Sequence, residues 1–261
     1  MITSRQNPLI KQLRKLRQTK GRREQDLLLL EGPNLIEAAL QRGYALEHFC
    51  YTEPWQHRQP QLWQQAIAAA QRSEAVSPEV LAAIATTVNP DGAIATLAQT
   101  QLTVVPPAQI SLGVAIDRLQ DPGNLGTIIR TAAAAAADGI WLSPQSVDPQ
   151  NPKVLRASAG AWFQTPLVSN IDLSGAIHAW QQQGIQVIAT TAQATPTYWS
   201  IDWRRPSLIL LGNERGGLTP QHLAAADQQV CIPQAKTVES LNLGVCAALL
   251  LYEALRQRGN F

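Results

Sequence analysis

The sequence LILLGNERGGL at residues 208–218 joins an unbroken aliphatic run to a polar, glycine-rich loop. A strand of purely aliphatic residues is typical of a parallel sheet that helices cover on both faces. Two further polar stretches follow strand-like runs: DPGNLGTIIR at residues 121–130 and IPQAKTVESLN at residues 232–242. Ligands bind in open α/β sheets where loops leave the carboxyl ends of strands, so the three loops predict one composite site.

Strand-like and helical segments alternate along the whole chain of 261 residues, which predicts an α/β fold. A polar stretch that contains Pro106-Pro107 predicts a linker at residues 99–112. We therefore expect one α/β domain at residues 1–98 and a second at 113–261. The expected strands are 26–32, 48–52, 92–97, 114–119, 140–142, 185–190, 208–211 and 229–232. The expected longer helices are 32–40, 62–71, 126–137, 174–183 and 241–257, and short helices are expected after Ser77-Pro78 and Thr219-Pro220.

The formal net charge of +2 conceals an uneven distribution of charge. The first 23 residues hold only basic charged residues and carry +8, which leaves −6 on the rest of the chain. Such a segment can contact phosphates, although a solvated helix face has the same composition. Leu9, Ile10, Leu13 and Leu16 recur at helical spacing, so we expect a helix with one packed face and one basic face.

Composition and motifs exclude several classes of protein. No run of about 18 apolar residues indicates a membrane span, and the first residues lack the apolar core of a secretion signal. Cys50, Cys231 and Cys246 are far apart and form no paired motif, so neither a metal site nor a disulfide framework is expected. A cytoplasmic location fits this cysteine usage.

Two enzyme classes also fit poorly. His178 and His222 have no motif around them, and no histidine accompanies Ser240, so a serine-hydrolase triad is not supported. The glycines at 212–217 do not follow the dinucleotide-binding spacing, which argues against a nicotinamide oxidoreductase.

The loops contain residues that are able to do chemistry. Arg130 lies one helical turn beyond Gly126, so its guanidinium can reach back over the loop, and its planar fork matches phosphate oxygens. Asn124 can cap the following helix or bind a substrate. Ser240 is a plausible N-cap of the last helix, although a polar residue at that helix mouth also suits a ligand pocket. Each loop alone is compatible with an ordinary strand-exit turn.

Taken together, the patterns Asn124-x-Gly-x-x-x-Arg130, Gly212-Asn-Glu-x-x-Gly-Leu218 and Ile232-Pro followed by Ser-Leu-Asn242 resemble the three motifs of the SpoU (TrmH-type) branch of the SPOUT RNA methyltransferases. Residues 1–98 resemble the N-terminal RNA-binding domain common in that family. The resemblance implies a catalytic domain with a C-terminal trefoil knot, a homodimer, and S-adenosylmethionine bound in the knotted loops.

The resemblance also assigns roles by position. It implies a catalytic cluster of Asn124, Arg130, Glu214, Ser240 and Asn242, and cofactor contacts from Thr190, Gly212, Ile232 and Leu241. We expect RNA contacts from Arg14, Lys15, Arg17, Arg22, Arg23 and Arg156. The chain departs from the family pattern at Gln234 (usually methionine), Lys236 (commonly glycine) and Gly244 (usually a small hydroxyl residue), and Lys236 could add a phosphate contact.

The implied reaction transfers a methyl group to a ribose 2′-hydroxyl of RNA, with ribosomal RNA expected first and transfer RNA second. An arginine side chain keeps its proton at neutral pH, which makes Arg130 a poor base, so we expect it to hold the adjacent phosphate and stabilise alkoxide charge. Glu214 would orient Arg130 or Asn124, and Ser240 and Asn242 would place the ribose. Two alternatives are a non-catalytic RNA-binding protein with the same fold and a methyltransferase that acts on a base nitrogen.

Overall fold

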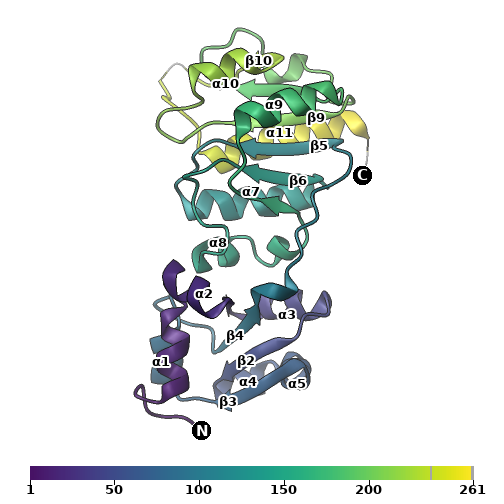
Figure 1. Cartoon of the computed structure of the whole chain (residues 1–261). Helices are drawn as coiled ribbons and strands as arrows, with labels where there is room; N and C mark the ends of the chain where they lie inside the picture. Colours follow the sequence, from purple (N-terminus) through teal and green to yellow (C-terminus); the bar gives the residue numbers. More distant parts are fainter. Residues whose placement is uncertain (236, 260–261) are drawn as a thin grey trace. The chain divides into compact units, whose positions relative to one another are not determined.

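The computed structural model describes residues 1–235 and 237–259, and the chain divides into two compact units (Figure 1). Unit 1 comprises Met1–Thr103 and Gln150–Phe163, and unit 2 comprises Val104–Pro149 and Gln164–Phe261. Residues 150–163 follow strands of unit 2 in the sequence, yet they pack within unit 1.

Unit 1 is built on a four-stranded sheet with the order β1-β4-β2-β3. The strands are β1 (Leu27–Glu31), β2 (Leu46–Tyr51), β3 (Ala70–Ala75) and β4 (Ala93–Ala98). Strand β3 pairs parallel to β2, whereas β4 pairs antiparallel to both of its neighbours. Three of these strands were expected, but β3 was missed, because its sequence AQRSEA is polar and the helix expected at 62–71 was extended into it.

Successive residues of β1 point to opposite faces of this sheet, and each face carries its own core. Leu28 and Leu30 pack with apolar residues of α3 (Pro33–Gln41), α4 (Glu53–Arg58) and α5 (Pro60–Ala69). Leu27 and Leu29 pack with α1 (Pro8–Lys15) and α6 (Pro78–Ile84). The helix expected from the leucine spacing near the N-terminus is therefore confirmed, and α2 (Thr19–Gln25) follows it.

Residues 150–163 contribute α8 (Pro152–Ala157) and the short 3₁₀ helix η2 (Ala161–Phe163) to unit 1. Leu155 is fully buried in the same core as Leu28, and the ring of Phe163 lies 5.7 Å from that of Tyr44. Another 3₁₀ turn, η1 (Gln99–Gln101), follows β4.

Unit 2 contains a six-stranded, wholly parallel sheet with the order β10-β8-β9-β5-β6-β7. The strands are β5 (Leu112–Ile116), β6 (Gly139–Leu142), β7 (Leu167–Val168), β8 (Gln186–Thr190), β9 (Ser207–Leu211) and β10 (Gln228–Val230). Every residue of β5 and β9 is buried, as the aliphatic run at 208–211 predicted.

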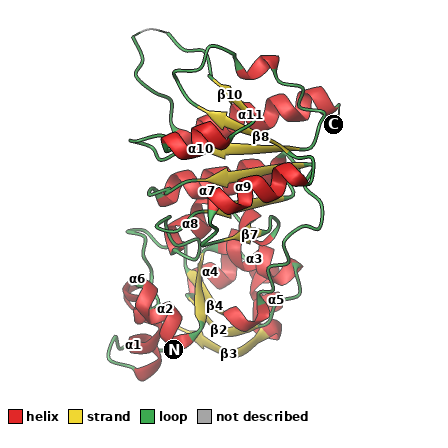
Figure 2. Cartoon of the chain, turned by 45° about the horizontal axis from the view of Figure 1, so that its top comes forward, coloured by secondary structure: helices red, strands yellow, loops and turns green. Residues whose placement is uncertain are grey.

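Helices flank this sheet (Figure 2). Leu208 and Leu210 pack with α9 (Leu173–Gln182) and α10 (Pro220–Ala225), whereas α11 (Leu243–Arg258) contacts β9 and packs along α7 (Pro122–Ala134). A third 3₁₀ helix, η3 (Tyr198–Ser200), precedes β9. Within the described residues, we find no helix with the length and apolar character needed to span a membrane.

The two helices that begin at the predicted loops start at residues other than those expected. Helix α7 begins four residues earlier than the expected residue 126, because the side chain of Asp121 caps it by accepting from the N–H of Asn124 (2.8 Å). Helix α11 is capped by Asn242, whose Oδ1 accepts from the N–H of Gly244 (2.9 Å), so the prediction of Ser240 as the N-cap is wrong. Asn124 and Asn242 therefore both lie at helix N-termini.

Candidate active site and RNA-binding surface

Asn124 connects the three predicted loops. Its Nδ2 donates to Oε1 of Glu214 (3.3 Å), and its Oδ1 accepts from Nδ2 of Asn242 (2.8 Å). One residue from each loop thus enters a single hydrogen-bonded cluster, which we call the Asn124 cluster. The structure brings these three predicted catalytic residues together at the N-termini of α7 and α11.

The Glu214 carboxylate is oriented by the chain that leads into α7. It accepts from the backbone N–H of Gln120 (3.3 Å) and of Asp121 (3.1 Å), in addition to Asn124. These three donors fix the direction of the Glu214 side chain at the N-terminus of α7. Of the two partners considered for Glu214, the structure selects Asn124 rather than Arg130.

The loop that carries Glu214 is closed by Asn213, for which no role was predicted from the sequence. The backbone of Asn213 exchanges two hydrogen bonds with Gly217, and its Oδ1 accepts from the N–H groups of Arg215 and Gly216. A Cβ on Gly212 would lie 2.2 Å from the carbonyl carbon of Gly217, so this tight loop itself requires glycine there. An asparagine that bonds the backbone two residues later is a recognised turn signal.

Arg130 lies apart from the Asn124 cluster. Residues six positions apart on a helix point to different faces, and Arg130 shares the exposed face of α7 with Thr127. Among the described residues it makes no hydrogen bond or ion pair, so the expected reach of its guanidinium over the loop is not seen within one chain. Ser240 is also exposed and has no polar partner in the described part of the chain.

The predicted cofactor residues are half-buried or buried at strand and helix ends. Thr190 ends β8 and donates from Oγ1 to the carbonyl of Leu210 (3.3 Å). Ile232 and Leu241 are half-buried, and within the described residues their backbone N–H groups make no hydrogen bond. Apolar side chains beside open backbone donors match what a pocket for a mixed polar and apolar ligand requires. Lys236, which departs from the family pattern and was expected to add a phosphate contact, lies outside the described residues.

Neither metal nor thiolate chemistry finds support in this part of the chain. Across residues 1–235 and 237–259, no three His, Cys, Asp or Glu side chains are grouped so as to hold a metal ion. Cys246 lies one turn into α11, and burial raises the pKa of its thiol, which disfavours a nucleophilic thiolate.

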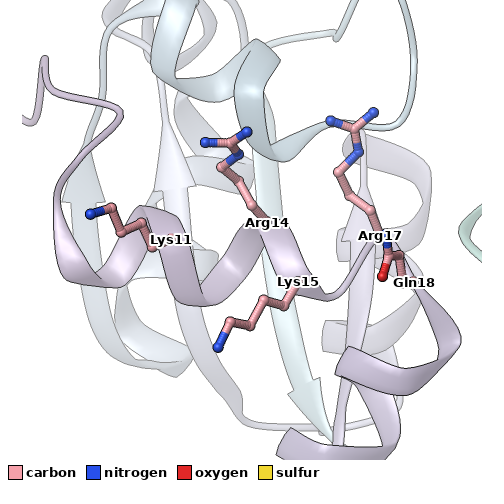
Figure 3. A pocket seen from close by; sticks show the side chains of 5 residues that line it. All are labelled: Lys11, Arg14, Lys15, Arg17 and Gln18. Carbon is pink, nitrogen blue, oxygen red and sulfur yellow. The ribbon is translucent and has the colours of Figure 1, made fainter.

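The basic face of α1 lies in unit 1. Arg14, Lys15 and Arg17 are exposed and, with Lys11 and Gln18, line an open surface depression (Figure 3). Figure 3 shows Arg14 and Arg17 extending to the same side of the helix. Arg23, on α2, is also exposed. These four predicted RNA-binding residues are therefore accessible to a polyanion.

Two other arginines predicted to bind RNA have structural contacts instead. Arg22 is only 1% exposed, and its guanidinium donates to the carbonyl of Leu16 (3.1 Å) and to Thr19 (3.0 Å), which fixes α2 against the end of α1. Arg22 cannot contact RNA from this position, and that prediction is corrected.

Arg156, on α8, forms an ion pair with Oε1 of Glu31 (2.9 Å) and bonds the hydroxyl of Thr86. The Glu31 side chain is 5% exposed and that of Arg156 is 26% exposed. The guanidinium of Arg156 thus pairs with a buried carboxylate of β1 within unit 1. This ion pair gives Arg156 a structural role and does not support the predicted contact with an RNA phosphate.

Comparison with known proteins identifies the family. The model of the SpoU rRNA methylase family matches residues 111–252, and that of the MRM3-like substrate binding domain matches residues 7–95. The chain belongs to the SpoU rRNA methylase family. The predicted resemblance, the α/β fold class and the enzyme class of RNA methyltransferase are confirmed.

The family relatives match along both units. The chain is 50% identical to an uncharacterized tRNA/rRNA methyltransferase of Synechocystis sp. over 98% of this chain and 94% of that protein. It is 30% identical to the 23S rRNA (guanosine(2553)-2′-O)-methyltransferase of Bacillus subtilis over 96% and 97% of the two chains. The crystal structure of an AdoMet-bound rRNA methyltransferase from Sinorhizobium meliloti aligns with a TM-score of 0.82 at 33% identity, covering 98% and 97% of the chains.

Proposed function

We propose that this SpoU-family methyltransferase transfers a methyl group from S-adenosylmethionine to a ribose 2′-hydroxyl of ribosomal RNA. The observation that carries the proposal is the Asn124 cluster, which joins all three family motifs through the side chains of Asn124, Glu214 and Asn242. Ribosomal RNA is favoured over transfer RNA because the Bacillus subtilis relative, which matches along both units, is named for 23S rRNA. Residues 1–98 would bind the RNA, residues 99–112 would link the two domains, and residues 113–261 would carry out methyl transfer.

The loops around Thr190, Gly212, Ile232 and Leu241 suit S-adenosylmethionine. The half-buried side chains of Ile232 and Leu241 offer an apolar surface, and their open backbone N–H groups offer donors for the polar edge of an adenine. When bound, S-adenosylmethionine supplies the methyl group from its positively charged sulfonium. The trefoil knot that the resemblance implies for these loops stays a prediction.

Within the Asn124 cluster, the amide orientations follow from the hydrogen-bond network. Oδ1 of Asn242 accepts from the N–H groups of Gly244 and Val245, so its Nδ2 must face Asn124. Oδ1 of Asn124 then faces Asn242, and its Nδ2 faces Glu214. An amide nitrogen carries two hydrogens and an amide oxygen two lone pairs, so each asparagine keeps polar capacity for ribose hydroxyls.

Methyl transfer is an in-line displacement, for which positioning the two reactants supplies much of the rate. Asn124 and Asn242 would hold the ribose in place, together with Ser240, which lies in the same loop as Asn242. Glu214 holds the amide of Asn124 in place. Arg130 would bind the phosphate next to the target and stabilise negative charge as the hydroxyl loses its proton to solvent.

A homodimer accounts for an apolar surface beside Arg130. A groove between α7, η3 and α11 is lined by Thr127, Tyr198, Gly244, Val245, Ala248, Leu249, Tyr252 and Glu253. Val245 is 46% and Tyr252 51% exposed, and neighbouring Trp199 is 58% exposed, which is costly for side chains of this size in a monomer. A second copy of the chain would cover this surface and lie next to Arg130 on the same face of α7.

Light scattering in solution tests the dimer. Val245→Asp and Tyr252→Asp should shift the mass from dimer to monomer, because a buried unpaired charge opposes association. Val88→Asp is the matched control, since Val88 is 93% exposed on unit 1 and should leave the mass unchanged. A monomeric wild-type protein would refute the dimer. We also propose a cytoplasmic location, where the reducing environment keeps free cysteines such as these three reduced.

The activity is tested with purified protein, isotopically labelled S-adenosylmethionine, and separate preparations of 23S rRNA, 16S rRNA and transfer RNA. We expect label in ribosomal RNA at one nucleotide whose 3′ phosphodiester resists alkali, because a 2′-O-methyl group blocks cleavage. Label in transfer RNA, or on a base, would contradict the proposal.

Arg130→Ala is the companion variant. It should abolish methyl transfer while calorimetry shows unchanged binding of S-adenosylmethionine, since Arg130 makes no hydrogen bond or ion pair with the predicted cofactor residues in the described structure. Full activity of this variant would exclude Arg130 from catalysis. No cofactor binding by the wild type would instead favour the non-catalytic RNA-binding alternative.

A further inference from the structure

A buried polar network lies beneath the catalytic loops. Asp117 follows β5, and its side chain is 4% exposed. Its Oδ1 accepts from the hydroxyl of Ser143 (3.1 Å), and its Oδ2 accepts from Nε of Arg118 (3.1 Å), with Nη2 of Arg118 at 3.0 Å. Nδ1 of His222 lies 3.4 Å from the same carboxylate, but it makes no hydrogen bond within the described residues. Ser143 and Arg118 therefore hold the carboxylate.

Arg118 occupies a conformation that its residue type disfavours. Its φ is +51°, in the left-handed region, where the Cβ of any residue other than glycine meets the following carbonyl. Two contacts maintain this conformation: the Arg118 N–H donates to the hydroxyl of Ser143 (2.7 Å), and the guanidinium is paired with Asp117. The left-handed conformation of Arg118 also explains why β5 ends at Ile116, three residues before residue 119, where the expected strand ended.

The carbonyl of Arg118 points at the second loop as a consequence. It accepts from Nδ2 of Asn213 (2.7 Å) and from Nε2 of Gln120 (3.1 Å). Asn213 in turn closes the loop through its Oδ1 and its backbone pairing with Gly217. Glu214 is the next residue, so the direction of the Arg118 carbonyl determines where the Glu214 carboxylate meets Asn124.

We propose that Asp117 is a positioning residue for methyl transfer: it holds Arg118 in the left-handed conformation, which aims the Arg118 carbonyl at Asn213 and places Glu214 against Asn124. The Asp117 side chain makes no hydrogen bond or ion pair with the Asn124 cluster in the described structure, and its link to that cluster runs through the backbone of Arg118. The kinetic test of this inference rests on the proposed function, whereas hydrogen exchange tests it independently of methyl transfer.

Two substitutions of Arg118 separate backbone conformation from charge. Arg118→Ala and Arg118→Gly both remove the guanidinium, but only glycine adopts the left-handed conformation without strain. We expect Arg118→Gly to keep kcat close to wild type. Arg118→Ala should lower kcat about ten-fold, because the cost of a left-handed alanine corresponds to roughly one decade in rate. Equal losses in both variants would mean that the guanidinium itself matters and would overturn the proposal.

Asp117→Asn removes the charge that holds Arg118 and should lower kcat about ten-fold with little change in KM for S-adenosylmethionine. Asp117→Asn combined with Arg118→Gly should return kcat to within about two-fold of Arg118→Gly alone, because the constraint is then no longer needed. A carboxylate that acted directly on the substrate, or that only stabilised the fold, would show no such rescue. Absence of rescue therefore refutes the positioning role.

Hydrogen exchange of the peptide at residues 211–218 reports on the loop whether or not the protein methylates ribosomal RNA. Asp117→Asn and Arg118→Ala should speed exchange of the amides of Arg215, Gly216 and Gly217, whereas Arg118→Gly should not. Unchanged exchange in Asp117→Asn would overturn the inference. An inactive wild type with the expected exchange pattern would instead refute only the proposed function.

Discussion

Asn242 donates a hydrogen bond from Nδ2 to Oδ1 of Asn124 across 2.8 Å, although the two residues are 118 positions apart in the sequence. The same Asn242 caps α11 through its Oδ1. One side chain thus both starts the last helix and reaches the Asn124 cluster, so its capping and its catalytic roles can be separated by substitution.

Asn242→Asp and Asn242→Ala form a matched pair. Aspartate keeps the capping oxygen but loses the donor to Asn124, whereas alanine loses both. We expect both variants to lower kcat about 100-fold, the usual loss for a misplaced catalytic donor. Only Asn242→Ala should also lower the free energy of unfolding, by about 1 kcal/mol for the lost cap. Thermal melts and single-turnover methylation measure the two effects, and wild-type kcat in Asn242→Asp would show that the link to Asn124 is not used.

The exposed basic residues of α1 and of the turn that follows it should supply salt-dependent affinity for RNA. Replacing Arg14, Lys15 and Arg17 together by glutamine removes up to three phosphate contacts, so the slope of log K against log salt should flatten by about 2 to 3. Binding titrations of an rRNA fragment at several salt concentrations measure this slope. Methylation at saturating RNA should be retained, because these residues lie in unit 1, outside the Asn124 cluster.

Arg22→Met is the control for that experiment. The buried guanidinium of Arg22 bonds Leu16 and Thr19, so this variant should lower the melting temperature and leave the salt slope unchanged. A slope that flattens as much in Arg22→Met as in the triple glutamine variant would mean that α2 rearranges on RNA.

Local patterns in the sequence were enough to predict the α/β fold, because aliphatic strands such as 208–211 and their polar exits are defined by neighbouring residues. The Asn124 cluster was predicted through the family motifs rather than from spacing, since its members lie about 30 to 120 positions apart. Arg22 and Arg156 could not be recognised as structural, because their partners give no local signal: Glu31 is 125 positions from Arg156. The left-handed turn at Arg118 was equally hidden, since arginine does not mark such a conformation.

Arg156 and Glu31 should make a large contribution to the stability of unit 1. Among the described residues, Arg156→Ala leaves the Glu31 carboxylate, 5% exposed, with the N–H and hydroxyl of Thr86 as its donors. Removing one partner of a buried ion pair costs about 3 to 5 kcal/mol, and we expect the lower end here because the Arg156 side chain is 26% exposed. Urea denaturation followed by the fluorescence of the unit 1 tryptophans measures the loss.

Arg204→Ala provides the comparison for Arg156. Arg204 pairs with Asp202 at 2.7 Å, but their side chains are 72% and 44% exposed, so its removal should leave the melting temperature almost unchanged. Similar losses in the two variants would indicate that the Glu31 pair is solvated in solution.

Gly244 of α11 lies close to Thr127 of α7, and a side chain at position 244 would disturb this approach. A Cβ on Gly244 would lie 2.9 Å from Cγ2 of Thr127 and 3.1 Å from Oδ1 of Asn242. Gly244 is also a position where the chain departs from the family pattern, which usually has a small hydroxyl residue. We infer that the methyl group of Thr127 occupies the space that this side chain would need.

Gly244→Ser should therefore destabilise the protein by about 1 to 3 kcal/mol through overpacking, and lower kcat by displacing Asn242 from Asn124. Thr127→Ala alone should have little effect, because Thr127 is exposed on α7. The double variant should recover both stability and kcat, since alanine vacates the space next to position 244. A coupling energy of about 0.5 to 3 kcal/mol in this double-mutant cycle is the expected result. Strict additivity of the two substitutions would show instead that the serine is accommodated elsewhere and that Thr127 does not set the spacing of α7 and α11.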